Sequence, residues 1–371
     1  MVGPGELFPP KPRGLKGRRS ELLTLEQTIL RAAPTRLALV GAGGCGKSML
    51  ASALGHRLSG FFRGSVHWFR VGTWDFRTLS EMFALRFGTR RGDGRVTALR
   101  RHFRSSGPML IVLDNHENDR ATARLLETFS DAPLTFVITA RRCLLAGVLI
   151  FPVTAPLVML GKSAFPRVAK LTRLLRFNPL ALDIADGIVE SGAETVATLA
   201  STLRKRGVDR VVPIEHEDDV PEVALLVEWA WKRLSPETRR MLALLAHVEG
   251  DHVDASSLAR LARVKRKPEQ ALAPLLLYRL IQEPAAGRFT LHAVVRHAVK
   301  RRTTISHAAV FEHYVSLLEQ HPERLLVEQS HLFAAMDHAS RTHDLQAMLR
   351  VEELIRTLDA EPEERAGVSE R

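Results

Sequence analysis

The chain has 371 residues, of which 45 % are hydrophobic and 25 % charged, and its formal net charge is +12 at neutral pH. This length exceeds one compact core and fits about two to four domains, while the composition excludes a disordered or fibrous protein for the bulk of the chain. Only two cysteines occur, Cys45 and Cys143, which excludes a secreted disulfide framework and predicts a cytoplasmic protein.

Residues 1–16 contain prolines, glycines and basic residues but no continuous apolar run of the kind that a signal peptide needs, and we expect a leader or linker there. Residues 144–160 are nearly all apolar. Pro152 and Pro156 interrupt this run and Gly147 weakens it as a helix, and the strands of buried parallel sheets are also continuously apolar. We therefore expect no membrane span and no membrane partner.

Residues 17–160 alternate apolar, strand-like runs with amphipathic helical stretches, which is typical of a parallel sheet covered by helices. The expected strands are 37–40, 66–71, 109–113, 134–139 and 148–153. This part of the chain is predicted to be an α/β domain.

After residue 160 the apolar spacing becomes helical, and residues 161–212 are predicted to form a small helical domain. The helical pattern breaks at Asn178 and Pro179, where the proline can begin a new helix. Residues 213–221 are polar and acidic, which indicates a linker or an exposed loop.

Helices are expected over 223–234 and 235–247, the second with Ser235 as N-cap and Pro236 at its first position. Two shorter helices follow, and residues 280–283 and 288–291 can pair as a hairpin. Helices followed by a terminal hairpin predict a winged-helix domain over 213–302.

The last part of the chain is helical in its apolar spacing and then becomes polar. We expect a short, helical, tetratricopeptide-like tail over 303–360 and a disordered end over 361–371. No repeat period can be demonstrated in so short a segment.

A glycine-rich segment between an expected strand and an expected helix fits the P-loop pattern G-x-x-x-x-G-K-[ST]. It consists of Gly41, Ala42, Gly43, Gly44, Cys45, Gly46, Lys47 and Ser48, and Met49 follows it. The glycines allow consecutive backbone amides to surround an anion, and the helix start adds its positive dipole end. Lys47 is expected to reach the β- and γ-phosphates and Ser48 to bind Mg²⁺. Cys45 can be a filler of the loop or a redox-active thiol.

Polar residues end two further strands. Asp114 follows an apolar run and is expected to be the acid on the Mg²⁺ side, although an aspartate can also simply end a strand. Asn115 can orient water but cannot take its proton, so Glu117 is the nearest candidate base. Arg141, after the next strand, can reach the γ-phosphate as a sensor or can be an ordinary basic surface residue.

These pieces, in this order, resemble the signal-transducing ATPases with numerous domains (STAND), specifically their NB-ARC branch, over residues 17–302. Gly17 and Arg18 resemble the entry motif of the family, whose arginine lies near the nucleotide. The residues 114–117 resemble the Walker B variant of the large ATP-binding LuxR-type regulators, and 139–141 the sensor motif. Asn178 and Pro179 are similar to the G-L-P-L-A-L helix start, in which the proline packs near the adenine.

His292 corresponds to the histidine of the M-H-D motif, which contacts the diphosphate of ADP in the closed state of the family. Here the triplet is Leu291-His292-Ala293, so the aspartate that helps to hold the closed state is replaced by Ala293. A histidine between a wing and a helix can also be a plain surface or core residue. The residues 332–336 resemble the first tetratricopeptide-like hairpin of bacterial members.

The resemblance implies an ATP/ADP switch with Mg²⁺ that is closed with ADP, hydrolyses ATP slowly and forms a homo-oligomer with ATP. It also implies a protein effector or sensor partner. The first alternative is a DNA-binding regulator that uses the winged helix and the basic cluster of Arg260, Arg263, Lys265, Arg266 and Lys267. The second is a scaffold that binds nucleotide without hydrolysing it. Asn115 and the absence of the aspartate at Ala293 suggest this alternative.

Overall fold

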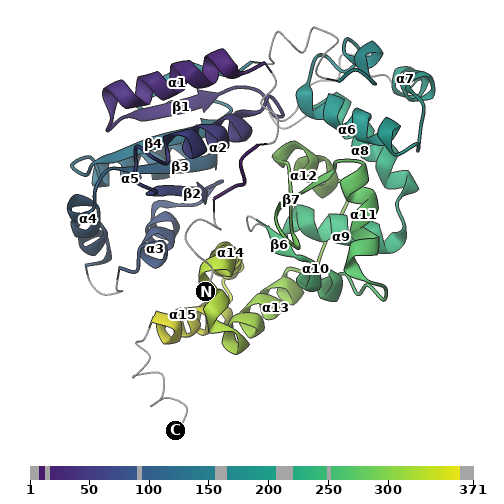
Figure 1. Cartoon of the computed structure of the whole chain (residues 1–371). Coiled ribbons are helices and arrows are strands. Elements are labelled where there is room, and N and C mark those ends of the chain that lie inside the picture. Colours follow the sequence, from purple (N-terminus) through teal and green to yellow (C-terminus); the bar gives the residue numbers. More distant parts are fainter. Residues whose placement is uncertain are drawn as a thin grey trace.

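The computed structural model describes residues 8–12, 17–89, 94–154, 165–205, 220–248 and 252–359. Its first part is a five-stranded parallel sheet in the order β2-β3-β4-β1-β5 (Figure 1). The strands are β1 (Arg36–Val40), β2 (Val66–Arg70), β3 (Met109–His116), β4 (Leu134–Ala140) and β5 (Leu149–Pro152). A strand forms at every apolar run where one was expected, and the predicted parallel α/β core is confirmed.

Helices cover both faces of this sheet. Leu110 and Val112 pack on the side of α1 and α2, whereas Ile111 and Leu113 pack on the side of the other helices, because successive side chains of a strand point to opposite faces. A strand buried on both faces therefore reads as a continuous apolar run. The helices are α1 (Arg19–Ala32), α2 (Lys47–Leu58), α3 (Phe76–Arg86), α4 (Arg95–Ser105) and α5 (Asp119–Thr128).

The second part of the chain is mainly helical and shares one hydrophobic core that extends from Val168 to Tyr314. Its helices begin at sequence signals: Asn178 and Ser235 accept hydrogen bonds from backbone amides, and a proline follows each of them. The elements up to residue 247 are η3 (Ala169–Leu171), α6 (Pro179–Glu190), α7 (Val196–Lys205), α8 (Pro221–Arg233) and α9 (Pro236–His247).

A small antiparallel sheet in the order β6-β8-β7 completes this part. Its hairpin occupies the positions where residues 280–283 and 288–291 were expected to pair. The elements are β6 (Val253–Asp254), α10 (Ala255–Leu261), α11 (Pro268–Leu277), β7 (Ile281–Ala285), β8 (Arg288–Leu291) and α12 (Ala293–Lys300).

The helical tail packs on the first part of the chain. Leu332 and Phe333 share a core with Phe83 of α3, so the tail lies against the sheet domain (Figure 1). Its elements are α13 (His307–Gln320), η4 (Pro322–Arg324), α14 (Leu325–Arg341) and α15 (Leu345–Asp359).

Residues 8–12, which belong to the expected leader, pack against α2. Phe8 makes edge-to-face contacts with His56 and Trp68, and the carbonyl oxygen of Pro9 accepts a hydrogen bond of 2.8 Å from His56 Nε2. The rest of residues 1–16 and most of the expected linker at 213–221 lie outside the described residues, as do the apolar residues 155–160 and the polar end at 361–371. No helix in the described ranges is both long and apolar enough to cross a membrane.

Buried charges join the tail to the small sheet. Glu328 of α14 is fully buried, and its carboxylate accepts two hydrogen bonds from the Arg288 guanidinium of β8, at 3.0 and 2.8 Å. Arg324 connects Glu328 to Asp254 of β6, at 2.6 and 3.0 Å. A buried carboxylate is tolerated only where such partners replace its water, so this network fixes the position of α14.

We expect Glu328→Ala to destabilise the protein by about 3–5 kcal/mol, because it leaves Arg288 without its buried counter-ion. The matched control is Glu312→Ala, which removes an exposed partner of Arg350 and should cost less than about 1 kcal/mol. Urea unfolding followed by circular dichroism measures both. Equal losses in the two variants would contradict the role of the buried network.

Candidate functional site

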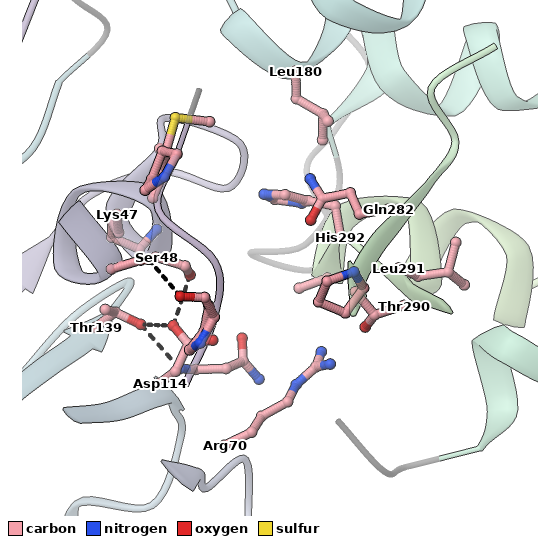
Figure 2. Close-up of a pocket in the computed structure, with 18 of the residues that line it drawn as sticks. Lys47, Ser48, Arg70, Asp114, Thr139, Leu180, Gln282, Thr290, Leu291 and His292 are labelled. Carbon is pink, nitrogen blue, oxygen red and sulfur yellow. Dashed lines mark hydrogen bonds between the residues drawn. The ribbon is translucent and has the colours of Figure 1, made fainter. Parts of the chain in front are cut away.

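A pocket of about 1630 Å³ lies where the parts of the chain meet. One wall is formed by the P-loop and by the ends of the strands of the large sheet, and the opposite wall by the start of α6, the β7–β8 hairpin and His292 (Figure 2). Residues of α14 also line it. A molecule bound there would contact several parts of the chain at once.

The P-loop connects β1 to α2. Gly44 and Gly46 have φ angles of 79° and 97°, a left-handed conformation that side chains disfavour. Lys47 Nζ donates hydrogen bonds to the carbonyl oxygens of Gly41 and Ala42, at 2.7 and 2.9 Å. Burial lowers the pKa of Lys47, and Arg141 adds to this effect while Cys45 and Asp114 oppose it. The ammonium group of Lys47 therefore lies inside the loop, and a bound anion there would stabilise its positive charge.

Asp114 lies beside the start of α2. Its Oδ1 accepts hydrogen bonds from Ser48 Oγ and from Thr139 Oγ1, both at 2.6 Å (Figure 2). The hydroxyl and the carboxylate that were predicted to serve Mg²⁺ are thus in direct contact, and oxygen atoms are the ligands that this ion prefers.

Strand β3 is irregular directly after Asp114. Asn115 has a φ of 57°, and the register between β3 and β4 shifts between Leu113 and His116. Asparagine is one of the few residues that adopt this conformation readily. Its side-chain amide donates to Glu117 Oε1 at 2.6 Å, so the candidate base is held at the rim of the pocket by the asparagine before it. Strand β3 continues to His116, beyond its expected end at residue 113.

Arg141 follows β4 and lines the pocket. Its charge lowers the pKa of both Lys47 and His292. The guanidinium therefore lies near the lysine and near the opposite wall.

Arg18 contacts the P-loop from outside. It is buried, and its guanidinium donates to the carbonyl oxygen of Cys45 and, at 2.6 Å, to that of Thr154. Glu21 accepts a further hydrogen bond from it at 2.6 Å. Cys45 itself is buried, whereas Met49 is partly exposed and lines the pocket. The structure thus places Arg18 as a support of the loop as well as at the pocket wall.

The start of α6 lies against the P-loop. Asn178 Oδ1 caps the helix by accepting a hydrogen bond from the amide of Ala181, and Asn178 Nδ2 donates to the carbonyl oxygen of Gly43 at 3.4 Å. Pro179 is the first residue of the helix and lines the pocket. Asn178, which directly precedes this proline, therefore contacts the P-loop itself.

His292 lies on the opposite wall, at the N-cap of α12, where its Nδ1 accepts a hydrogen bond of 3.3 Å from the amide of Val294. Burial in the pocket lowers its pKa to about 4, and the charges of Lys47, Arg70 and Arg141 contribute. The imidazole is therefore neutral at physiological pH. Close packing also joins the walls, because a Cβ atom on Gly43 would lie only 2.6 Å from Cγ2 of Val294.

The sequence motifs did not identify every residue of the pocket. Arg70 at the end of β2, and Gln282 and Thr290 of the small sheet, also line it (Figure 2). A signal for Arg70 existed, since an arginine at the carboxyl end of a parallel strand lies at the ligand-binding edge of the sheet. Gln282 and Thr290 carry no such signal, because only the position of the small sheet opposite the P-loop brings them to the pocket.

No protein-family model and no curated protein matches the sequence. A STAND protein with a tetratricopeptide repeat sensor from Pyrococcus horikoshii has a similar solved structure, with 18 % identity and a TM-score of 0.54. The match covers 95 % of this chain and 59 % of that one, so this chain spans less than two thirds of it. The ORC1 protein of Aeropyrum pernix in complex with DNA is 17 % identical over 80 % of this chain and 96 % of its own, with a TM-score of 0.40. The first likeness shows a shared fold, a parallel α/β core with flanking helices that matches the P-loop NTPase fold.

We expect the ring protons of His292 to titrate in nuclear magnetic resonance spectra near pH 4 rather than near the usual 6.5. Because the pKa is lowered, the folded arrangement keeps its full stability above about pH 6.5 and loses stability as the pH falls towards 4. The His292→Gln variant should lack one ring-proton resonance, and that loss assigns the resonance to His292. A resonance that titrates near pH 6.5 would contradict the enclosed position.

Proposed function

We propose that the chain is a signal-transduction switch of the STAND type that binds ATP or ADP with Mg²⁺ and hydrolyses ATP slowly. The observation that carries this proposal is the position of the P-loop and Asp114, which face His292 across a single pocket. A nucleotide held by the P-loop would touch both walls. Whether the bound nucleotide has two or three phosphates can therefore shift the equilibrium between a closed and an open form.

The backbone amides of residues 41–46 and Lys47 would hold the phosphates, and the helix start of α2 would add its dipole. Ser48 and Asp114 would hold Mg²⁺, which lies between the β- and γ-phosphates in such sites and neutralises charge that develops there. Their 2.6 Å hydrogen bond supports this role, because both oxygens already point to one place. Adenine would lie beside Pro179 and Met49, which line the same pocket.

We assign the closed form to ADP. A neutral His292 can donate one hydrogen bond to a diphosphate without bringing another positive charge to Lys47 and Arg141. The contact of Gly43 with Val294 and the hydrogen bond from Asn178 to Gly43 support a closed form here. A γ-phosphate would need additional space between these walls, so ATP would favour opening and self-association with further copies of the chain.

Hydrolysis would be slow because the candidate base is poorly placed. Glu117 Oε1 accepts a hydrogen bond from Asn115, which makes the carboxylate a weaker base towards water until that bond is released. Arg141 would stabilise the charge on the γ-phosphate. If Glu117 is never released, the chain is the alternative that we stated, a scaffold that binds nucleotide without hydrolysis.

We further assign the domains as predicted: the P-loop domain over 17–160, a helical domain over 161–212, a winged helix over 213–302 and a tetratricopeptide-like tail over 303–360. The order α9, β6, α10, α11, β7, β8 supports the winged helix, since it alternates helices with a three-stranded antiparallel sheet. The tail would receive a protein effector or sensor partner.

A DNA-binding regulator is the second candidate, because Arg260, Arg263, Lys265, Arg266 and Lys267 are all exposed near the start of α11. Against it, α11 itself carries no lysine or arginine, and its end packs on α6, where a Cβ atom on Gly187 would lie 2.6 Å from the carbonyl oxygen of Leu277. The helix that would enter a DNA groove thus carries an exposed glutamate, Glu269, and no basic residue, and its end is occupied within the chain.

We expect protein purified under native conditions to release ADP when it is denatured, and chromatography identifies the released nucleotide. The Lys47→Ala variant should contain no nucleotide, because it lacks the lysine whose positive charge would hold the phosphates. Added ATP should then increase the oligomer size of the wild type, measured by light scattering. A folded wild-type protein that neither contains nor binds nucleotide would refute the switch.

The DNA alternative has its own test, a gel shift with duplex DNA at increasing salt concentrations. The proposed switch predicts no shift at physiological salt. A salt-sensitive shift that disappears when Arg260, Arg263 and Lys265 are changed to alanine would favour the regulator.

A further inference from the structure

Arg70 lies on the P-loop face of the large sheet. It ends β2 and pairs in register with Asp114 of β3. Paired residues of parallel strands point to the same face, and Trp68, two residues earlier, packs on the side of α1 and α2. The side chain of Arg70 therefore stands beside that of Asp114, and Figure 2 shows its guanidinium in the space between the strand ends and the hairpin.

The Arg70 guanidinium has no protein partner among the described residues. The neighbouring carboxylate differs, since Asp114 Oδ1 already accepts hydrogen bonds from Ser48 and Thr139. An arginine that is half-buried in a pocket without a partner loses part of its hydration and receives nothing in return. Such a group is poised for an anionic ligand.

Charge in this space points to the same conclusion. Arg70, Lys47 and Arg141 all lie near enough to His292 to act on its protonation. Arg141 follows β4 and Arg70 ends β2, so the two arginines flank Asp114 from the two strands that neighbour β3. The terminal phosphate of a nucleoside triphosphate would complement this group of cations.

We propose that Arg70 binds the γ-phosphate of ATP and gives the site its preference for ATP over ADP. This inference rests on the proposed function. The P-loop follows β1, and the order β2-β3-β4-β1 places Arg70 on the far side of Asp114 from the loop. Ser48 and Asp114 would hold Mg²⁺ beside the phosphates, where it would neutralise their charge. A side chain one strand further, about 4.8 Å beyond Asp114, meets the terminal phosphate, which ADP lacks.

An arginine suits this role better than a lysine because its planar guanidinium can donate two parallel hydrogen bonds to phosphate oxygens. Arg70 and Arg141 would then hold the γ-phosphate from two sides. Loss of that phosphate would leave the Arg70 guanidinium without an anion opposite His292, which links the number of phosphates on the nucleotide to the position of the two walls.

The test is isothermal titration calorimetry of Arg70→Gln, Arg70→Lys and the wild type, each freed of nucleotide, with Mg²⁺ and either ADP or the non-hydrolysable analogue AMPPNP. Arg70→Gln should weaken AMPPNP about 10- to 100-fold, the loss of one or two charge-assisted hydrogen bonds. ADP affinity should change less than about threefold. Arg70→Lys should recover part of the AMPPNP affinity, since it keeps the charge but not the paired donors.

Arg101→Gln is the matched control, because Arg101 is exposed on α4 and does not line the pocket. It should leave both affinities unchanged. Equal weakening of AMPPNP and ADP by Arg70→Gln, or no weakening of either, would overturn the inference while the switch itself stands. A wild-type protein that binds neither nucleotide would instead refute the proposed function.

Discussion

The hydrogen bonds that converge on Asp114 are the interaction on which the pocket depends. Ser48 and Thr139 both donate to its Oδ1 at 2.6 Å, so the start of α2 and the ends of β3 and β4 are tied at one point. The constraint comes from the parallel sheet, which brings the carboxyl ends of its strands to a common edge. The left-handed backbone at Asn115 lies directly after the carboxylate, where the register between β3 and β4 shifts.

The second part of the chain closes over this edge through a few small residues. Gly43 leaves room for Val294, and Gly44 leaves room for Asn178, whose Oδ1 would lie 3.1 Å from a Cβ atom there. Larger side chains at these positions would push the walls apart. The glycines of the loop therefore serve two needs: their backbone can turn around an anion, and they permit the close approach of α6 and α12.

The tail adds a further constraint on the same arrangement. Residues of α14 line the pocket, share a core with α3 and carry Glu328 into the ion network of the small sheet. A movement of the hairpin relative to the large sheet would thus have to break buried charge pairs or carry the tail with it. Such pairs resist partial separation, since a single buried charge without its partner is costly. The buried ion network therefore holds the tail and the small sheet together as one unit.

The sequence by itself determined the elements and the near wall of the pocket. Continuous apolar runs set the strands, Ser235 and Asn178 set helix starts, and the spacing from Gly41 to Ser48 set the phosphate loop, because these signals depend on neighbours along the chain. The tertiary structure alone decided that Gln282, Thr290 and α14 reach the pocket and that Arg70 stands beside Asp114 without a partner. Contacts between residues far apart in sequence arise from strand order, register and domain packing, and local periodicity carries no record of them.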